Sequence, residues 1–247
     1  QICDNITVLR AGRTVGSIPV ANATEEDISR FMVGRDVILK MNKKPAEFGD
    51  TFLKVTDLTY ENKEGRKLLD HVSFSLKKGQ ILGIAGVEGN GQNELAEAIF
   101  GFYSGVKGSI LFDGKEILGK SIRAIRDDGI SYIPEDRIKT GAAGNISLWG
   151  NMIADIIDSP LLKKHGLLNY KNIHERADKL ISDFGVLCQN DDQPIGMLSG
   201  GNMQKVVVAR EFSSDPKLLI ANQPTRGIDV GANEFIWKKI IEQRDAG

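Results

Sequence analysis

The sequence lacks the features that mark membrane-spanning, disulfide-rich and nucleic-acid-binding proteins. Its 247 residues include two cysteines, Cys3 and Cys188, which fit neither a disulfide framework nor a metal-binding spacing. The longest apolar run, from Ile81 to Val87, contains two glycines and falls well short of the roughly 18 residues that cross a bilayer. Acidic and basic residues nearly balance, with a formal net charge of -1, so composition gives no reason to expect nucleic-acid binding.

What remains is the composition of an ordinary globular domain, with 41% hydrophobic and 26% charged residues. The length allows one sizeable core and a small satellite. Residues 1–36 are expected to form two short strands and a helix that Thr24 caps. Residues 37–50 mix lysine, proline and glycine and are interpreted as a linker. A second and larger unit is expected from residue 51 to residue 247.

The second unit alternates short apolar runs with helical patterns, which predicts an α/β fold with a mostly parallel sheet. Strands are expected at 52–58, 68–76, 80–85, 109–112, 130–133 and 217–221. Helices are expected near 92–100, 148–157 and 172–184, from 199 onward, and at 231–244. In this architecture the last helix leads back to the sheet through one more strand. We therefore expect the chain to be C-terminally truncated before that strand.

A glycine-rich turn follows one expected strand and opens a helix, which is the setting of a phosphate-binding loop. A Walker A loop has the pattern G-x-x-x-x-G-K-[ST] there, and Gly86, Gly89 and Gly91 occupy suitable places. Glycine permits positive φ and lets backbone N–H groups approach phosphate, while the helix N-terminus favours an anion. A tight connection between a strand and a helix would also use these glycines, so the turn alone does not decide between the two.

The side chains around this turn differ from those that phosphate chemistry uses. Gln92 stands where a lysine neutralises phosphate, and Asn93 stands where a hydroxyl ligates Mg²⁺. Glu94 adds negative charge, although it also suits the helix dipole. Asn222 and Gln223 end a strand where Asp and Glu would hold the Mg²⁺ shell and polarise the attacking water. Because amides are uncharged and poor bases, four such changes predict a site that has lost hydrolysis.

A second motif, Leu198-Ser199-Gly200-Gly201-Asn202, heads an apolar-periodic helix. At a helix N-terminus, the serine hydroxyl and the glycine N–H groups can bind a phosphate. The simpler alternative is a serine N-cap followed by two flexible glycines. The motif precedes the strand that ends at Asn222 by about 20 residues, a spacing interpreted as one phosphate-handling unit.

Taken together, these motifs resemble those of an ABC-type ATPase, and in particular the second nucleotide-binding domain of simple-sugar and nucleoside importers. The resemblance covers nearly the whole chain. It implies an ABC-type P-loop NTPase fold, with an antiparallel β subdomain beside the core sheet and a helical subdomain at about 138–198. It also implies that residues 1–36 are the C-terminal piece of a first domain and that residues 51–247 are an incomplete second domain. Asn222 and Gln223 resemble the nucleoside branch more than the ribose branch.

The resemblance assigns roles to further residues. Tyr60 occupies the place of the family's adenine-stacking aromatic, with ordinary strand packing as an equal alternative. Glu135 occupies the Q-loop position, where many members have glutamine that senses the γ-phosphate and couples to membrane subunits. Asp229 matches the D-loop, which runs along the interface between domains. The residues that would act on a partner's ATP site are therefore Ser199, Gly200, Gly201, Asn202 and Asp229.

The resemblance further implies the ATP-binding subunit of a membrane importer, peripheral at the cytoplasmic face of the membrane. The cofactors would be ATP and Mg²⁺, bound mainly at the partner domain's site, and no residue of this chain is assigned to a resident metal. The expected partners are a second ABC domain, transmembrane permease subunits and, indirectly, an extracytoplasmic solute-binding protein, with no nucleic acid. Two alternatives stay open: a self-sufficient P-loop ATPase, which Gln92, Asn222 and Gln223 oppose, and a nucleotide-independent docking module, which the intact Ser199-Gly200-Gly201 opposes.

Overall fold

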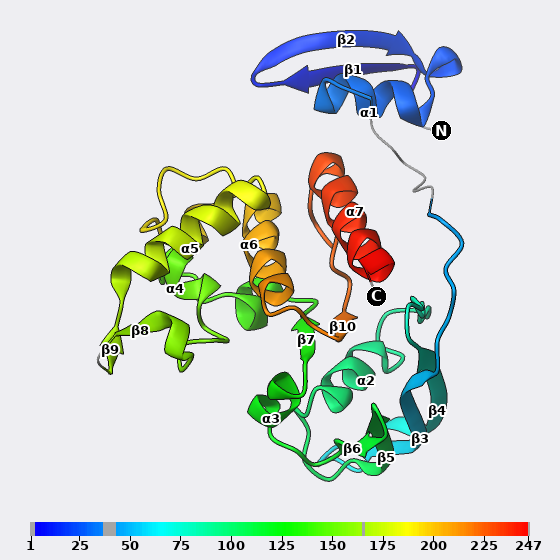
Figure 1. Cartoon of the computed structure of the whole chain (residues 1–247). Coiled ribbons are helices and arrows are strands. Elements are labelled where there is room, and N and C mark those ends of the chain that lie inside the picture. Colours follow the sequence, from blue (N-terminus) through cyan, green and yellow to red (C-terminus); the bar gives the residue numbers. More distant parts are fainter. Residues whose placement is uncertain (1–2, 37–42, 165, 247) are drawn as a thin grey trace.

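The computed structural model describes residues 3–36, 43–164 and 166–246, and Figure 1 shows a β-rich lobe, a helical lobe and a small N-terminal unit. The β-rich lobe contains a four-stranded sheet in the order β4-β3-β5-β6, with antiparallel pairing throughout. Its strands are β3 (Thr51–Glu61), β4 (Lys67–Lys77), β5 (Lys107–Phe112) and β6 (Lys115–Glu116). This sheet confirms the expected antiparallel β subdomain.

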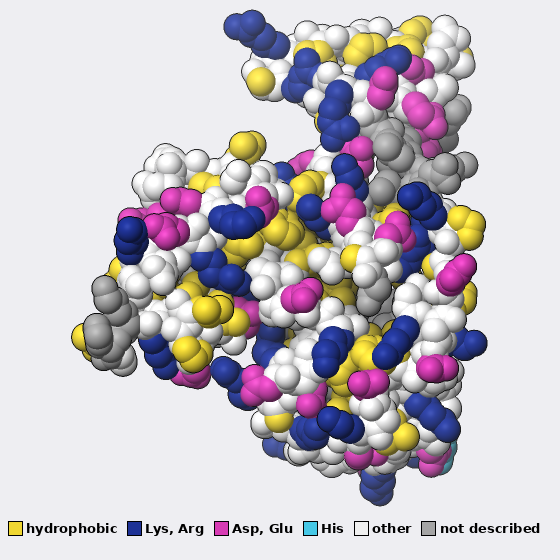
Figure 2. Space-filling view, in the orientation of Figure 1, with side chains coloured by type: hydrophobic (Ala, Val, Ile, Leu, Met, Phe, Trp, Pro, Cys, Tyr) yellow, Lys and Arg dark blue, Asp and Glu magenta, His cyan; other side chains and the backbone are white. Residues whose placement is uncertain are grey.

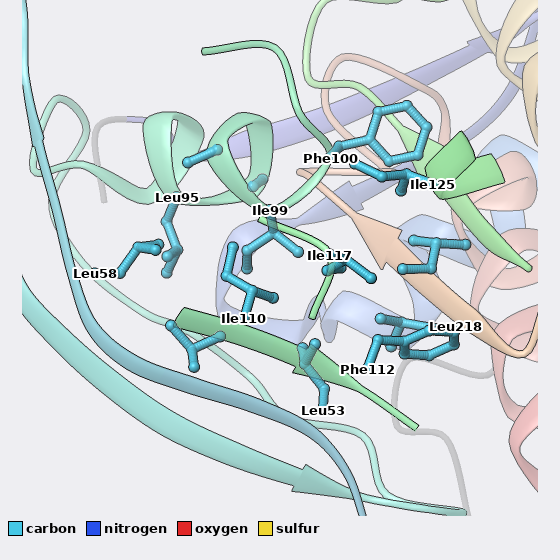
Figure 3. Close-up of a cluster of buried hydrophobic side chains, with 14 of the residues drawn as sticks. Leu53, Leu58, Leu95, Ile99, Phe100, Ile110, Phe112, Ile117, Ile125 and Leu218 are labelled. Atoms are coloured by element: carbon cyan, nitrogen blue, oxygen red, sulfur yellow. The ribbon is translucent and has the colours of Figure 1, made fainter. Parts of the chain in front are cut away.

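The first hydrophobic core lies between this sheet and helix α2 (Gln92–Ile99). Figure 3 shows Leu58, Ile110 and Ile99 directed into this core from the sheet and from α2. Each of these side chains is at most 5% exposed. Full burial of one such side chain stabilises the fold by roughly 1.5–3 kcal/mol, so this core fixes α2 against the sheet. Helix α3 (Ile122–Asp127) adds the buried Ile125 to the same cluster.

Two parallel strands, β7 (Ile130–Ile133) and β10 (Leu218–Ala221), form a separate pair with Leu218 opposite Ile130. They confirm the strands expected at 130–133 and 217–221. All four residues of β7 are buried, whereas β10 runs from a buried Leu218 to an exposed Ala221. The expectation that β10 is buried therefore holds only at its start, because the opposite edge of β10 has no strand beside it within the described ranges.

The strand expected at 80–85 is not formed, and this prediction was wrong. No backbone–backbone hydrogen bond joins residues 81–87 to any other residue that the structure describes. A strand requires a neighbour whose N–H and C=O groups complete its ladder. Ile81, Leu82 and Ile84 have the apolar character of a buried strand but are 47%, 39% and 52% exposed. Among the described residues, the parallel part of the sheet is thus limited to β7 and β10.

The exposed apolar segment 81–84 should promote self-association of the chain. We expect Ile84→Lys to reduce self-association while changing the free energy of unfolding by less than about 0.5 kcal/mol, because the side chain has little burial to lose. Sedimentation velocity over a concentration series and urea denaturation measure the two quantities. Ile157→Lys is the matched control, since Ile157 is 44% exposed and lies outside the segment. Equal association of the wild type and Ile84→Lys would contradict the prediction.

The helical lobe contains α4 (Leu148–Met152), α5 (Tyr170–Asp183) and α6 (Gly200–Ser213), packed around a second core. The helix expected at 172–184 is confirmed by α5. The helix expected at 148–157 ends at Met152, and its second half was predicted wrongly, because the backbone of the C-cap Ile153 (φ -109°, ψ 0°) leaves the regular helical conformation and residues 153–158 form turns. The lobe's short elements are η2 (Arg137–Gly141), η3 (Pro160–Leu162), β8 (Lys163–Lys164), β9 (Leu167–Leu168) and η4 (Ile195–Met197).

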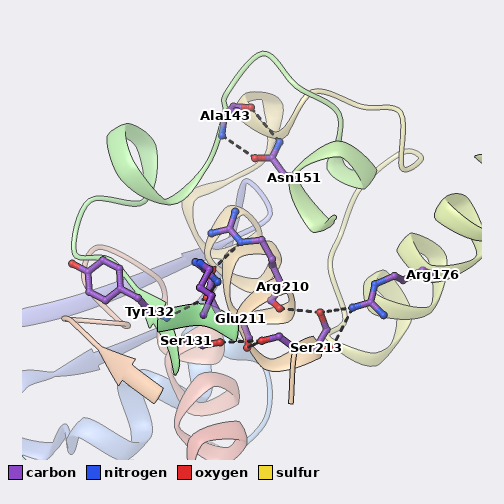
Figure 4. Close-up of polar contacts among 10 residues, drawn as sticks. Ser131, Tyr132, Ala143, Asn151, Arg176, Arg210, Glu211 and Ser213 are labelled. Carbon is purple, nitrogen blue, oxygen red and sulfur yellow. Dashed lines mark hydrogen bonds and ion pairs between the residues drawn. The ribbon is translucent and has the colours of Figure 1, made fainter. Parts of the chain in front are cut away.

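A buried ionic network connects the helical lobe to α3 and β7. The Glu211 side chain on α6 is 0% exposed and accepts hydrogen bonds from Arg126 Nη1 and Nη2 at 3.0 and 3.2 Å. It also accepts from Arg210 Nε at 2.9 Å and from the Tyr132 backbone N–H at 3.2 Å. Figure 4 shows the Arg210 side chain directed toward Glu211, and the Tyr132 ring directed away from it. One carboxylate therefore joins α6, α3 and β7.

The N-terminal unit consists of β1 (Asn5–Arg10), β2 (Arg13–Pro19), η1 (Val20–Asn22) and α1 (Glu25–Val33). Thr24 and Asp27 form a capping box at the start of α1, which confirms the predicted cap. The unit contacts α7 (Val230–Ala246) through an ion pair of 2.8 Å between Arg35 and Glu234. Of the expected linker, residues 37–42 lie outside the described residues, and 43–50 contain no helix or strand.

Within the described ranges, none of the helices combines the length and apolar character that crossing a bilayer requires. Figure 2 shows basic, acidic and hydrophobic side chains interspersed over the displayed face of the molecule.

Candidate functional site

The glycine turn at 86–91 leads directly into α2, and its geometry requires glycine at two positions. Gly89 and Gly91 have φ values of 85° and 95°, in the left-handed region that other residues rarely adopt. A Cβ atom at Gly91 would also lie 2.7 Å from the Leu68 carbonyl oxygen. The first N–H groups of α2 have no acceptor within the helix, so the turn presents them to an anion.

A cavity of about 650 Å³ opens beside this turn, within the usual size range of ligand pockets. The turn and α2 line the cavity together with β10 and the residues after it, and β3, β4 and the segment 82–85 add apolar side chains. The predicted site residues that line it are Gly86, Gly89, Gln92, Asn93, Glu94, Glu135, Asn222 and Gln223. Gly91, which is the N-cap of α2, does not line the cavity, and neither do Tyr60 and the signature residues.

Gln92 and Asn93 make side-chain hydrogen bonds in place of phosphate and metal contacts. The Gln92 Nε2 donates across the turn to the Val87 carbonyl oxygen at 3.2 Å. The Asn222 Nδ2 donates to Asn93 Oδ1 at 2.6 Å, which joins the first turn of α2 to the end of β10. A Mg²⁺ ion favours carboxylate or hydroxyl oxygens, and the Asn93 oxygen is already engaged. The backbone N–H groups of the turn can therefore bind phosphate, whereas the side chains present are poor ligands for Mg²⁺.

The Q-loop position usually carries glutamine and the end of the Walker B strand glutamate. In this chain the two types are reversed, with Glu135 at the first position and Gln223 at the second. The Gln223 Nε2 donates to Glu135 Oε1 at 3.0 Å, so the pair keeps one carboxylate on the opposite wall. Glu135 also forms an ion pair with Arg226, whose Nη2 lies 3.4 Å from Glu88 Oε1. Arg226 is not among the predicted site residues. Its position three residues after Gln223 is the only sequence signal that points to it.

Tyr60 stacks on Tyr103, with ring centroids 4.5 Å apart and an angle of 18° between the rings. The Tyr103 hydroxyl donates to the Glu97 carboxylate on α2. Burial, followed by this hydrogen bond, raises the pKa of Tyr103. The stack covers one face of Tyr60 and ties it to α2, and the adenine-stacking role of Tyr60 stays a prediction.

The signature residues begin α6, at a surface that is separate from the cavity. The exposed Ser199 hydroxyl accepts hydrogen bonds from the Asn202 backbone N–H at 3.4 Å and from Asn202 Nδ2 at 3.0 Å. Gly201 is buried, and a Cβ atom there would lie 2.8 Å from Asp229 Oδ2. Asp229 Oδ1 accepts from the Ala232 backbone N–H at 2.9 Å. The fold thus brings the signature and the predicted D-loop residue together.

Arg137 connects the signature to the turn that follows β10. Its Nη1 and Nη2 donate to the carbonyl oxygens of Arg226 and Gly227 at 2.7 and 3.2 Å. A Cβ atom at Gly200 would lie 2.7 Å from Arg137 Nη2, so the guanidinium approaches the signature closely. One arginine side chain therefore binds the turn after β10 and lies beside the start of the signature helix.

His174 and Asp191 form an ion pair in the helical lobe, close to the loop that leads to the signature. The His174 Nδ1 lies 2.5 Å from Asp191 Oδ2, and the Trp149 Nε1 donates to Asp192 Oδ1 at 2.9 Å. The sequence prediction assigns no resident metal, and His174, Asp191 and Asp192 place one potential ligand atom each within 4.8 Å of one another. The histidine and the indole already provide partners for both carboxylates.

This ion pair predicts a pH-dependent contribution to stability. The hydrogen bond with Asp191 raises the pKa of His174 above its usual value of about 6.5. Because the folded-state pKa is raised, the stabilisation is complete below about pH 6.5 and is lost as pH rises through the raised value. We expect the difference in thermal midpoint between the wild type and His174→Gln to shrink over that window. In an Asp191→Asn background, the His174→Gln substitution should change the thermal midpoint by the same amount at every pH. A pH-independent difference between the wild type and His174→Gln would contradict the prediction.

Three features together define an ATP-binding cassette. The glycine turn opens a helix and faces the end of a parallel strand. An antiparallel sheet lies on one side, and a helical lobe presents a helix that begins with serine-glycine-glycine. The chain belongs to the ABC transporter family, whose model matches residues 69–226. A solved nucleotide-free ATP-binding cassette from an ABC transporter has a TM-score of 0.66 and 26% identity with it. The match covers 80% of this chain and 79% of that one, which confirms the predicted fold class.

Similar curated proteins are named as import ATP-binding proteins. The guanosine import protein NupO of Bacillus subtilis is 39% identical over 246 residues, covering all of this chain and 48% of that protein. The nucleoside import protein NupA of Lactococcus lactis subsp. cremoris is 35% identical, with 100% and 49% coverage. The ribose import protein RbsA of Clostridium tetani is 38% identical, with 100% and 48% coverage. The chain thus spans about half the length of the curated relatives it matches.

Proposed function

We propose that this chain is the ATP-binding part of an importer for nucleosides or simple sugars, and that residues 199–202 complete the ATP site of a partner domain. The partner is the first ABC domain of the same polypeptide or a dimer mate. Residues 1–36 belong to that first domain, residues 37–50 link the two, and residues 51–247 form the second domain. The import functions named for the relatives, and their roughly twofold greater length, support this arrangement.

The observation that carries the proposal is the position of Ser199. Its hydroxyl is exposed at the N-terminus of α6 and does not line the chain's own cavity. A helix N-terminus with an exposed hydroxyl and free N–H groups stabilises a phosphate brought to it by another molecule. Asp229 lies directly behind the signature, where it supports the same surface.

The chain's own site is proposed to be non-hydrolytic. The hydrogen bond from the Asn222 side-chain amide to the Asn93 side-chain oxygen occupies the place of the Mg²⁺ ligands, and Gln223 lacks the carboxylate that would polarise water. ATP and Mg²⁺ would therefore act together at the partner's site. In this arrangement the partner domain hydrolyses ATP, and the present chain completes the partner's ATP site.

The proposed setting is the cytoplasmic face of the membrane, where the chain binds permease subunits. An extracytoplasmic solute-binding protein would contact those subunits and affect the chain only indirectly. The choice of solute would lie with these other proteins.

The test measures Mg²⁺-dependent ATP hydrolysis by the full-length protein and by this chain alone. We expect turnover in the full-length protein and none in the chain alone. Turnover by the chain alone would favour a self-sufficient ATPase and contradict the proposal. Full-length turnover that does not depend on Ser199 would favour the nucleotide-independent docking module.

A further inference from the structure

The charged side chains in the described lining of the proposed nucleotide site are all acidic. Glu88, Glu94 and Glu135 line it, and its described lining includes no lysine, arginine or histidine. Gln92, at the position of the usual lysine, offers a neutral amide that is engaged with Val87. A triphosphate would bring further negative charge into this space, where like charges repel strongly unless a cation lies close by.

Among the residues that the structure describes, Arg226 is the cation that forms ion pairs with this lining. Its Nη2 lies 3.4 Å from Glu88 Oε1 in the glycine turn, and its Nη1 pairs with Glu135 after β7. The two carboxylates come from different walls of the cavity. The Arg226 side chain is 49% exposed, so its guanidinium bridges the walls at the solvent side of the cavity.

The backbone that carries Arg226 is fixed by three separate hydrogen bonds. The Arg226 N–H donates to the Gln223 carbonyl oxygen at 3.0 Å, closing a turn in which Gln223 has a φ of 45°. Arg137 Nη1 donates to the Arg226 carbonyl oxygen at 2.7 Å. Gln204 Nε2 donates to the Pro224 carbonyl oxygen at 2.8 Å. A cation on a preorganised turn loses less conformational freedom when it binds an anion.

We propose that Arg226 is the phosphate-binding cation of this site, in place of the lysine that is absent at Gln92. The inference rests on the proposed nucleotide-binding role of the cavity. A guanidinium forms two parallel hydrogen bonds with a phosphate, which makes arginine well suited to this role. The phosphate displaces Glu88, whose side chain is 77% exposed, while Glu135 is 19% exposed and keeps the guanidinium in position.

Two consequences follow for nucleotide binding. Because arginine supplies the compensating charge, ATP binds without Mg²⁺, and the hydrogen bond between Asn93 and Asn222 stays closed. Because Glu88 competes with phosphate for Arg226, removing the Glu88 charge strengthens binding. Because the Glu88 carboxylate also repels phosphate directly, this gain identifies Arg226 as the phosphate ligand only if it is lost when Arg226 is itself replaced by glutamine.

The test is calorimetric titration of the chain with ATP in the presence of EDTA. Arg226→Gln should weaken binding about 10- to 100-fold, the range for a lost hydrogen bond to a charged group. Arg226→Lys should fall between this variant and the wild type, because lysine keeps the charge but loses the bidentate geometry. Glu88→Gln should tighten binding about 2- to 5-fold, as expected for an exposed competing ion pair. Inorganic tripolyphosphate should give the same order of affinities.

Arg123→Gln is the matched control, because it removes the same charge from outside the cavity lining. Arg123 is 51% exposed and pairs with Asp127 at 3.1 Å and with Asp158 at 3.4 Å. Its substitution should leave ATP affinity unchanged. Urea denaturation of every variant separates a loss of binding from a loss of folding. If Arg226→Gln does not fold, Arg226→Lys and Glu88→Gln decide the outcome.

Equal affinity of the wild type and Arg226→Gln, or weaker binding by Glu88→Gln, would overturn the assignment. Absence of ATP binding by the wild type at millimolar nucleotide would also overturn it. Neither result bears on Ser199, whose role is measured by hydrolysis at the partner's site. Failure of this inference and failure of the proposed function are therefore distinguishable.

Discussion

Replacing Ser199 with alanine is expected to lower ATP hydrolysis by the full-length protein by about 100-fold or more. The exposed hydroxyl at the N-terminus of α6 would donate to the γ-phosphate held by the partner domain. Charge develops on that phosphate during transfer, and loss of one preorganised donor to such charge typically costs about 10²–10³ in kcat. Steady-state phosphate release at saturating ATP measures the effect.

Ser121→Ala is the control, because Ser199 is also the N-cap of its helix. The Ser121 hydroxyl caps α3 by accepting from the Ala124 N–H at 3.3 Å, and Ser121 does not line the cavity. Each substitution should lower the free energy of unfolding by about 1 kcal/mol through the lost cap. We expect Ser121→Ala to keep wild-type turnover. Wild-type turnover in Ser199→Ala as well would refute the donated signature and leave the serine as a plain N-cap.

Replacing Glu211 with alanine is expected to lower the free energy of unfolding by about 3–5 kcal/mol, the range for breaking a buried ion pair from one side. The Glu211 side chain is 0% exposed and is the shared acceptor of Arg126, Arg210 and the Tyr132 N–H. Its removal leaves two guanidinium groups without this acceptor in a site where water has little access. Chemical denaturation with urea, followed by circular dichroism, measures the change.

Two further variants test the physical cause of this effect. Asp183→Ala removes the exposed pair with Lys179 on α5 and should cost no more than about 0.5 kcal/mol. The triple variant Arg126→Met, Arg210→Met and Glu211→Leu removes all three charges of the network, and it should recover much of the stability lost in Glu211→Ala. A cost below about 1 kcal/mol for Glu211→Ala would show that the network does not hold the lobes together.

The sequence alone identified the features that depend on short stretches of chain. The glycine turn, the start of α2, the Ser199 cap of α6 and the Thr24 cap of α1 each involve residues a few positions apart. Their φ preferences and local hydrogen bonds act whatever the rest of the chain does. The same motifs carried the resemblance to the ABC family, which the family model and the solved structure confirm.

The tertiary structure decided the features that depend on distant neighbours. Residues 80–85 have the composition of a strand but form none, because no described residue completes their hydrogen-bond ladder. Asn222 meets Asn93 across 129 positions, and Gln223 meets Glu135 across 88. No sequence motif predicted a role for Arg226. Its charged partners lie far away in the sequence, and only the fold brings them beside it. Short-range preferences set the local geometry of this protein, and long-range pairing set the chemistry of its cavity.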